Sequence, residues 1–201
     1  MTNPTVGEII KAQVTDENDA YFFAQVDGYT YEVDKLELEK PLKLGGFVTG
    51  FAYENENHKL QITKKIPTVQ KDSYGWGTVV ATRHDLGVFV AIGLPNKDLV
   101  VSLDDLPTIT TLWPQKGDRL MVAMKSDSKG RLWGEIAQQS IFDAVSRRAP
   151  EGMKSKKVKA TVYRNKIAGT LIVTEEYYLG FIHPSQRYDE PRLGQVVDRK
   201  S

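Results

Sequence analysis

A short glycine-centred motif occurs three times along this chain, and it constrains the fold more than any other feature. The segment LGGFV at 44–48 returns as KGDRL at 116–120 and as LGQVV at 193–197. The central glycines, Gly45, Gly117 and Gly194, lie 72 and 77 residues apart. Self-similarity at a nearly fixed spacing predicts tandem copies of one small module rather than a single large domain.

The second module shows most clearly how each copy is built. Short apolar runs rich in Val and Phe alternate with turns that contain Gly, Asn, Asp or Pro, a pattern typical of strands joined by tight connections. The runs are 76–82, 87–92, 99–103, 120–124 and 131–136. Five strands with a longer excursion between the third and the fourth predict a small Greek-key barrel of the OB type. We expect the excursion, 104–116, to plug one end of the barrel.

The first module follows the same plan, and the third module begins it without finishing. Runs in the first are 9–14, 21–26, 29–36, 47–53 and 60–63, and those in the third are 158–163, 169–174 and 178–183. After Gly194 only 195–201 remain, so a closing hairpin is missing. We therefore expect an all-β chain of three tandem five-stranded barrels, the third incomplete at its C-terminus because the sequence is a fragment of a longer chain. The alternative is that the third module closes in an unusual way.

These patterns divide the chain into four parts. They are a first barrel at 1–66, a second at 67–140, a helical basic linker at 141–155 and a truncated third barrel at 156–201. Apolar residues at helical spacing predict one helix over 140–149, ended by Pro150. A basic approach to the third barrel follows, made of Lys154, Lys156, Lys157 and Lys159.

The composition excludes several classes of protein. The chain has no cysteine, so a disulfide scaffold, an iron–sulfur cluster and a thiol nucleophile are impossible. The longest apolar stretch, 87–95, is too short to span a bilayer, and no secretory signal is visible. The three histidines, His58, His84 and His183, show no close pairing. We expect a cytoplasmic protein without a metal ion or cofactor.

The net charge of +1 conceals a gradient along the chain. Residues 1–66 hold 7 Lys and Arg against 11 Asp and Glu, a net charge of −4. Residues 67–140 hold 8 of each, and residues 141–201 hold 12 against 7, a net charge of +5. This asymmetry indicates that the C-terminal end is suited to a polyanion and the N-terminal end is not.

Reactive groups that would indicate an enzyme do not converge in this sequence. Gly75-Trp76-Gly77 begins like a dinucleotide-binding loop, but Val80 takes the place of the third glycine. The adjacent carboxylates Asp104-Asp105 and Glu175-Glu176 are better explained as solvated turns than as acid–base pairs. We predict that the protein is not an enzyme.

Three segments resemble the RNA-binding domain of the ribosomal-protein-S1 type. The segment DLGVFV at 85–90 is similar to its Phe-Gly-x-Phe strand, and DSKGR at 127–131 is similar to its Asp-x-x-Gly-Arg hairpin. In the third module, GFIHPS at 180–185 resembles its Gly-Leu-Val-His-x-Ser strand. The three segments fall in register with the repeat.

The wider sequence resembles the conserved virulence factor B family of bacterial regulators. Similar segments are GLP at 93–95, DLP at 105–107, LWPQ at 112–115, Tyr163-Arg164 and EPRLG at 190–194. The resemblance implies three S1-like barrels followed by a winged-helix domain beyond Ser201. It also implies RNA binding and control of gene expression.

The second module keeps only part of the S1 binding face. Phe89 occupies the second ring position, and Asp127 and Arg131 keep the hairpin pair. Leu86 replaces the first ring and Ser102 replaces the histidine.

The other two modules depart further from the S1 pattern. The third keeps His183 but has Ala168 and Leu171 at the ring positions, so we expect no stacking platform there. The first offers the rings of residues 21–23 in an acidic setting, and alternation alone does not say which ring points outward.

Our leading hypothesis is a non-enzymatic protein that binds single-stranded RNA mainly through its basic third module. The expected phosphate contacts are Lys156, Lys157, Lys159, Arg164, Lys166, Arg187 and Arg192. Phe89, Arg131 and Asp127 are the candidate RNA-binding residues of the second module. The expected stacking groups are His183, Tyr177 or Tyr178.

Structural roles compete with several of these assignments. Phe89 could equally pack in the core or between barrels, Arg131 could pair with Asp127 within its turn, and His183 could serve its strand. The rival function is a protein-interaction scaffold built from OB barrels that have lost their nucleic-acid face. The acidic first module favours that rival.

Overall fold

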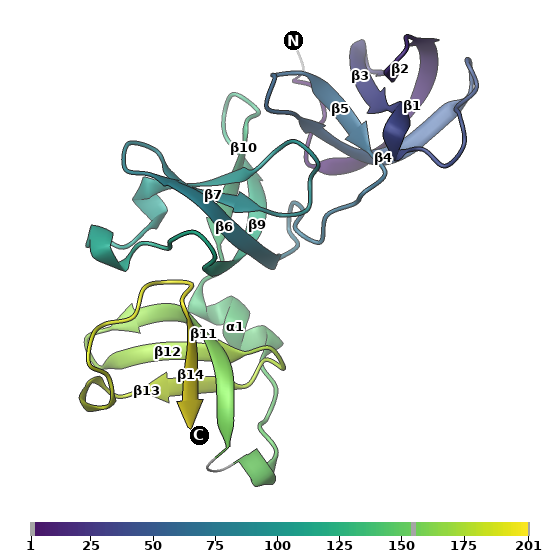
Figure 1. Ribbon diagram of the computed structural model, residues 1–201. Helices are drawn as coiled ribbons and strands as arrows, with labels where there is room; N and C mark the ends of the chain where they lie inside the picture. The colour runs from purple at the N-terminus through teal and green to yellow at the C-terminus, as the bar shows by residue number, and fades with distance from the viewer. Residues whose placement is uncertain (1–2, 154–155, 201) are drawn as a thin grey trace. The chain divides into compact units, whose positions relative to one another are not determined.

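The computed structural model describes residues 3–153 and 156–200, and its regular secondary structure consists mainly of strands (Figure 1). These strands form three sheets, as the repeat predicts. The first is a closed barrel in the order β1-β2-β3-β5-β4. Its strands are β1 (Glu8–Glu17), β2 (Tyr21–Val26), β3 (Tyr29–Asp34), β4 (Phe47–Glu54) and β5 (Leu60–Thr63).

Alternation along the strands places the core of the first barrel. Neighbouring strands pair antiparallel, except that β5 closes the barrel parallel to β3 through Glu32 and Gln61. Successive side chains point to opposite faces, so every second residue enters the interior. The buried interior comprises Ala12, Val14, Phe22, Ala24, Tyr31, Val33, Val48, Ala52 and Ile62.

The second barrel is also closed, in the order β10-β8-β7-β6-β9. Its strands are β6 (Gly75–Arg83), β7 (Gly87–Ala91), β8 (Leu99–Ser102), β9 (Arg119–Ser126) and β10 (Leu132–Ile136). The excursion between β8 and β9 contains two one-turn 3-10 helices, η2 (Leu103–Asp105) and η3 (Thr110–Leu112). Trp113, which directly follows η3, is buried, and its Nε1 donates to the Pro107 carbonyl at 2.6 Å.

The third sheet has four strands in the order β13-β12-β11-β14 and does not close among the described residues (Figure 1). The strands are β11 (Lys157–Lys166), β12 (Gly169–Thr174), β13 (Leu179–Ile182) and β14 (Val196–Lys200). The sequence pattern did not predict β14, which pairs antiparallel with β11 as β4 pairs with β1. This arrangement agrees with the expectation of an incomplete third barrel.

The repeated glycine makes the same backbone contacts in all three repeats, which we call the glycine clamp. The glycine N–H donates to the carbonyl of a valine in the first strand of its repeat, and that valine's N–H donates to the carbonyl of the residue after the glycine. The glycine-to-valine bonds are Gly45 to Val14 at 2.7 Å, and Gly117 to Val79 and Gly194 to Val162 at 2.8 Å each. All three glycines have positive φ, between 78° and 94°, which explains the residue type.

The predicted helix is shorter than the sequence indicated. It forms as α1 (Gln139–Val145), whereas residues 146–149 leave the helix. Ser146 is extended, and the Arg147 N–H donates to the Tyr177 carbonyl at 2.9 Å instead of to an intrahelical carbonyl. A tertiary contact therefore ends α1 before Pro150. No helix among the described residues is long and apolar enough to cross a membrane.

The chain divides into two compact units. The first contains Met1–Gly75, Ala91–Leu99 and Ala123–Gly134. The second contains Trp76–Val90, Val100–Val122 and Glu135–Ser201.

We predict that Gly87→Ala destabilises the protein much more than Gly93→Ala. Both glycines have positive φ, but a Cβ at Gly87 would collide with the Val101 carbonyl oxygen, whereas nothing lies within 4 Å of a Cβ at Gly93. The unfavourable backbone alone costs about 1–2 kcal/mol, and forced overpacking adds roughly 1–3 kcal/mol. Urea unfolding followed by tryptophan fluorescence measures both variants. Equal losses of stability in the two variants would show that the close approach of β7 and β8 does not restrict the residue at position 87.

Candidate functional site

A side chain caps the turn that follows the third strand in every repeat. The turns are η1 (Lys35–Glu37), η2 and η5 (Pro184–Gln186). The caps are Asp34, Ser102 and His183, which accept from the backbone N–H two residues later at 2.8, 3.3 and 3.3 Å. His183 therefore has a structural task through Nδ1, although its side chain is exposed. Such a cap stabilises a turn by satisfying a backbone donor.

The third repeat carries an exposed aromatic ring that the sequence analysis missed. Phe181 on β13 is 51% exposed, while its neighbour Ile182 is buried in the core. Strand alternation from Ile182 could have placed this ring outside. Leu171 lies directly opposite Phe181 on β12. It occupies a ring position of the S1 pattern but is not aromatic. An exposed ring therefore lies on β13, beside the two non-aromatic ring positions that the sequence indicated.

The first repeat has the reverse arrangement on its equivalent strands. Phe22 is buried in the core, whereas Phe23 is only half-buried and lies opposite Glu32. In the second repeat Phe89 is half-buried on the equivalent strand, β7. The outward ring therefore lies on the second strand in the first two repeats and on the third strand in the third.

Register places a cation on the same face as the exposed ring. Arg164 on β11 pairs with Leu171 on β12, which pairs with Phe181 on β13. Directly opposite residues point to the same side of a sheet. Gly169 makes room for the ring, because a Cβ there would collide with Phe181. We call Arg164, Leu171 and Phe181 the outward row.

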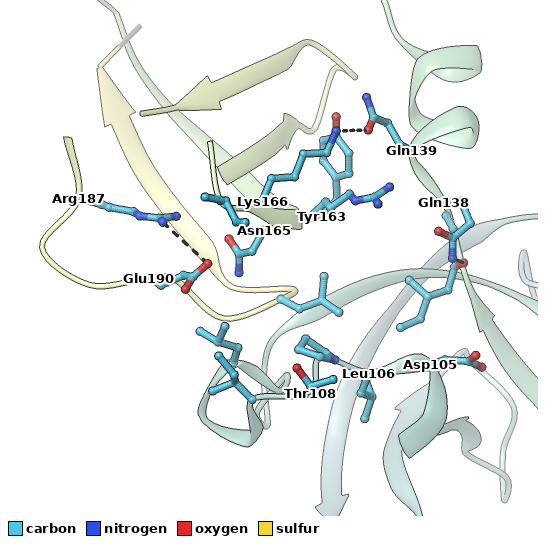
Figure 2. A pocket seen from close by; sticks show the side chains of 18 residues that line it. Asp105, Leu106, Thr108, Gln138, Gln139, Tyr163, Asn165, Lys166, Arg187 and Glu190 are labelled. Carbon is cyan, nitrogen blue, oxygen red and sulfur yellow. Dashed lines mark hydrogen bonds and ion pairs between the residues drawn. The ribbon is translucent and has the colours of Figure 1, made fainter. Parts of the chain in front are cut away.

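A pocket of about 630 Å³ in the second compact unit adjoins the outward row at Arg164 (Figure 2). Its walls come from the turn at 105–109, from the segment 136–139 and from the third repeat. Three of the predicted phosphate-binding residues line it: Arg164, Lys166 and Arg187. Lys166 reaches across to Gln139, with its Nζ donating to Oε1 at 2.8 Å (Figure 2).

Arg187 is held in place rather than open to solvent. Its side chain is only 12% exposed; its guanidinium donates to Thr170 and lies 3.8 Å from a Glu190 carboxylate oxygen. Thr170 in turn donates to Asn165 at 2.8 Å. This chain of contacts positions the pocket wall. Arg164, in contrast, is exposed and has no ion-pair partner among the described residues.

Arg192 also has a structural partner. Its Nε and Nη2 donate to the two carboxylate oxygens of Asp118 at 3.0 and 3.1 Å, and the side chains are 28% and 9% exposed. Asp118 follows the clamp glycine of the second repeat. Beside this pair, the Arg119 N–H donates to the carbonyl of Gly194 at 2.8 Å. The predicted contact of Arg192 with phosphate would have to compete with this pair.

The other predicted residues of the third repeat do not gather in the same place. Lys156 is exposed just before β11, Lys157 and Lys159 are exposed at its start, and Lys154 lies outside the described residues. Tyr177 and Lys159 line a second pocket of about 250 Å³. Tyr178 lines a third, more apolar pocket.

In the second repeat, Asp127 organises the turn that was expected to bind RNA. Its carboxylate accepts from the backbone N–H groups of Lys129 and Arg131, from the Arg131 guanidinium at 2.7 Å and from Trp133 Nε1 at 3.2 Å. Desolvation raises the pKa of Asp127, but these hydrogen bonds outweigh it and lower the pKa to about 2. Arg131, 59% exposed, also lies over the Trp133 ring. The contacts favour the turn-stabilising interpretation of the pair, and RNA contact by Arg131 stays a prediction.

In the first compact unit, a buried polar cluster is satisfied internally. Tyr53 donates to Asn96 Oδ1 at 2.7 Å, and Asn96 and Asn55 both donate to Gln61 Oε1. Burial raises the pKa of Tyr53 well above its ordinary value. Among the described residues, no group of three or more carboxylates and histidines could hold a metal ion.

Comparison with known families assigns each repeat to a family model. The S1 domain model matches residues 6–65, the CvfB first S1-like domain matches 74–135, and the virulence regulatory factor CvfB second domain matches 142–200. These matches agree with the three sheets.

Individual relatives are similar over nearly the whole chain. An uncharacterized protein of Bacillus subtilis, YitL, is 34% identical over 95% of the chain. A protein of Staphylococcus epidermidis named conserved virulence factor B is 30% identical over 90%. The chain spans 64% and 61% of these two relatives' lengths. A crystal structure described as a multidomain protein with nucleic acid binding domains, from Streptococcus pneumoniae, matches with a TM-score of 0.92 and 45% identity, covering 97% of this chain and 68% of that one.

We predict that Arg192→Met costs about 2–3 kcal/mol of stability, because it leaves the Asp118 carboxylate buried without its partner. Arg131→Met is the matched control, because the Arg131 side chain is 59% exposed and solvent screens its ion pair, so the loss of stability should be clearly smaller. Urea unfolding compares the two. An Arg192→Met variant as stable as the control would show that the buried pair contributes little.

We also predict that the Asp127 carboxyl titrates near pH 2 in the folded protein and that Arg131→Met raises its pKa. Because the folded pKa is depressed, the stabilisation from Asp127 is complete above the ordinary value near 4 and is lost as the pH falls toward 2. Carboxyl carbon NMR measures this titration. A pKa near 4 would contradict the hydrogen bonding described.

Proposed function

We infer that this chain, which belongs to the conserved virulence factor B family, is a non-enzymatic protein that binds single-stranded RNA and serves in post-transcriptional control of bacterial gene expression. The observation that carries this proposal is the outward row. It places an exposed ring and an unpaired guanidinium on one face of a sheet.

Proteins commonly bind single-stranded nucleic acid by combining exposed aromatic rings with cationic side chains. Bases stack on aromatic rings whatever their sequence, while cations neutralise the phosphates. Phe181 supplies the ring, and Arg164 supplies a charge that no carboxylate neutralises among the described residues. The net charge of +5 over 141–201 supports a polyanionic ligand.

The pocket beside Arg164 extends this face. Arg164 and Lys166 line it together with polar groups and apolar walls (Figure 2). A phosphate or sugar of a strand crossing Phe181 could enter there, with Arg187 and Glu190 holding the wall. The description of the Streptococcus relative as having nucleic acid binding domains supports the same class of ligand.

One observation favours a different function for the first repeat. Its outward Phe23 lies opposite Glu32, and residues 1–66 carry a net charge of −4. A carboxylate beside the ring repels phosphate. We propose that this repeat serves as a protein-interaction scaffold rather than an RNA platform.

The proposal predicts that a fluorescently labelled oligouridylate binds the chain and that Phe181→Ala weakens binding roughly 5- to 100-fold, as the loss of one stacked base does. Phe47→Ala is the matched control, because Phe47 is also exposed, at 59%, but lies in the acidic first repeat. Fluorescence anisotropy measures both. Equal affinity of the two variants, or no binding at low salt, would contradict the proposal.

Charge reversal tests the phosphate contact separately. Arg164→Glu should weaken binding and reduce the slope of log affinity against log salt by about 0.7 for each lost phosphate contact. Lys116→Glu, an exposed change in the second repeat, should leave affinity and slope close to those of the unmodified chain. An unchanged slope for Arg164→Glu would remove Arg164 from the interface.

A further inference from the structure

The 250 Å³ pocket in the second compact unit has no role in the outward row, yet it has the chemistry of a base-binding site. Its lining includes two aromatic residues, Trp76 and Tyr177, and two cations, Arg119 and Lys159. Drug-sized ligands occupy pockets of about 300–1,000 Å³, so this one has room for a single base rather than for several.

The main evidence that this pocket binds a ligand comes from Arg119. Its guanidinium lies over the Trp76 ring at 5.6 Å, and its Nε is buried without a hydrogen-bond partner among the described residues. A buried donor without a partner is costly, and it indicates a ligand or water that satisfies it. The planar guanidinium is also a surface on which bases stack.

Tyr177 is held in an uncommon backbone conformation at the edge of this pocket. Its φ is 66°, a region that a bulky residue seldom adopts. Its N–H donates to the Thr174 carbonyl at 3.0 Å, and its carbonyl accepts from the Arg147 N–H at 2.9 Å. These bonds fix the backbone that positions the ring.

The floor of the pocket lies one row along from the outward row. Thr161 pairs with Val173 on one side and with Val196 on the other, and all three line the pocket. Val173 follows Leu171 by two residues, so it lies on the same face about 7 Å farther along β12. A strand that stacks on Phe181 would therefore have its neighbouring nucleotides within reach of this pocket.

The rim of the pocket includes two exposed charged residues, Lys159 and Glu175. Lys159 is exposed and has no ion-pair partner among the described residues, so it can meet a phosphate. Glu175 is exposed on the rim and can accept a hydrogen bond only from a donor. Carboxylates recognise the amino group of cytosine in this way.

We propose that this pocket binds one unstacked nucleobase that carries an exocyclic amino group. The base stacks on the Arg119 guanidinium beside Tyr177, its amino group donates to Glu175, and its phosphate lies near Lys159. The proposal rests on the proposed function for the identity of the ligand as a nucleotide, and it adds a base preference that the outward row does not provide.

Backbone amide NMR with cytidine monophosphate and uridine monophosphate tests the pocket directly, because the two probes differ in the amino group. The expected result is saturable shifts at 159–161 and 173–177, with cytidine monophosphate binding at least fivefold more tightly. Glu175→Gln should abolish this preference. No shifts at these amides, or equal affinity for the two probes, would overturn the proposal.

Tyr177→Asn removes the ring with a residue that tolerates positive φ, and it should weaken cytidine monophosphate binding at least fivefold. Tyr188→Asn, a change at a fully exposed tyrosine outside the pocket, is the matched control. Equal affinity of these two variants would also overturn the proposal.

The results separate this inference from the proposed function. If oligouridylate binding depends on Phe181 but the pocket amides do not shift, the base-binding pocket is contradicted and the proposed function is retained. Saturable mononucleotide shifts without oligouridylate binding would support the pocket and contradict the proposed function.

Discussion

The structure depends on the glycine clamp, the pair of backbone hydrogen bonds that ties a loop to the first strand of each repeat. The clamp needs a residue at positive φ whose N–H meets a valine carbonyl, and the three glycines supply it at distances between 2.7 and 2.8 Å. It fixes where the fourth strand begins, since β4, β9 and β14 each start two residues after the clamp glycine. The period of the sequence is therefore the period of a hydrogen-bonding constraint rather than of a hydrophobic pattern.

The basic residues of the third repeat fall into two groups, according to whether a side chain of the protein binds them. Arg192 is bound by Asp118, which follows a clamp glycine, and Arg187 is bound by Thr170 and Glu190. Both guanidiniums are therefore occupied by side chains of the protein itself. Arg164 and Lys159 have no such partners among the described residues, and they lie on the face that carries Phe181. A charge count makes all four equivalent, whereas burial and pairing separate the cations that build the fold from those that remain available to a ligand.

Local patterns predicted the strands and the incomplete third barrel, because alternation, turn residues and the repeated glycine are local signals. They failed where a distant group decides the outcome. The helix α1 ends early because the Arg147 N–H bonds to Tyr177, thirty residues farther along the chain. Strand alternation from the apolar Ile182 places Phe181 outside the core, whereas the S1 pattern puts a ring position at Leu171 on the neighbouring strand. The second pocket was not predictable, since Trp76, Arg119 and Tyr177 come from three separate segments.

The central claim is that single-stranded RNA lies across the third repeat and not across the first. Photo-crosslinking with an oligonucleotide that contains 4-thiouridine, followed by mass spectrometry of the attached peptides, tests this most directly. The account predicts attachment within 157–188, at or beside Phe181, and its loss in high salt. Attachment mainly within 1–66, or equally to all three repeats, would contradict it.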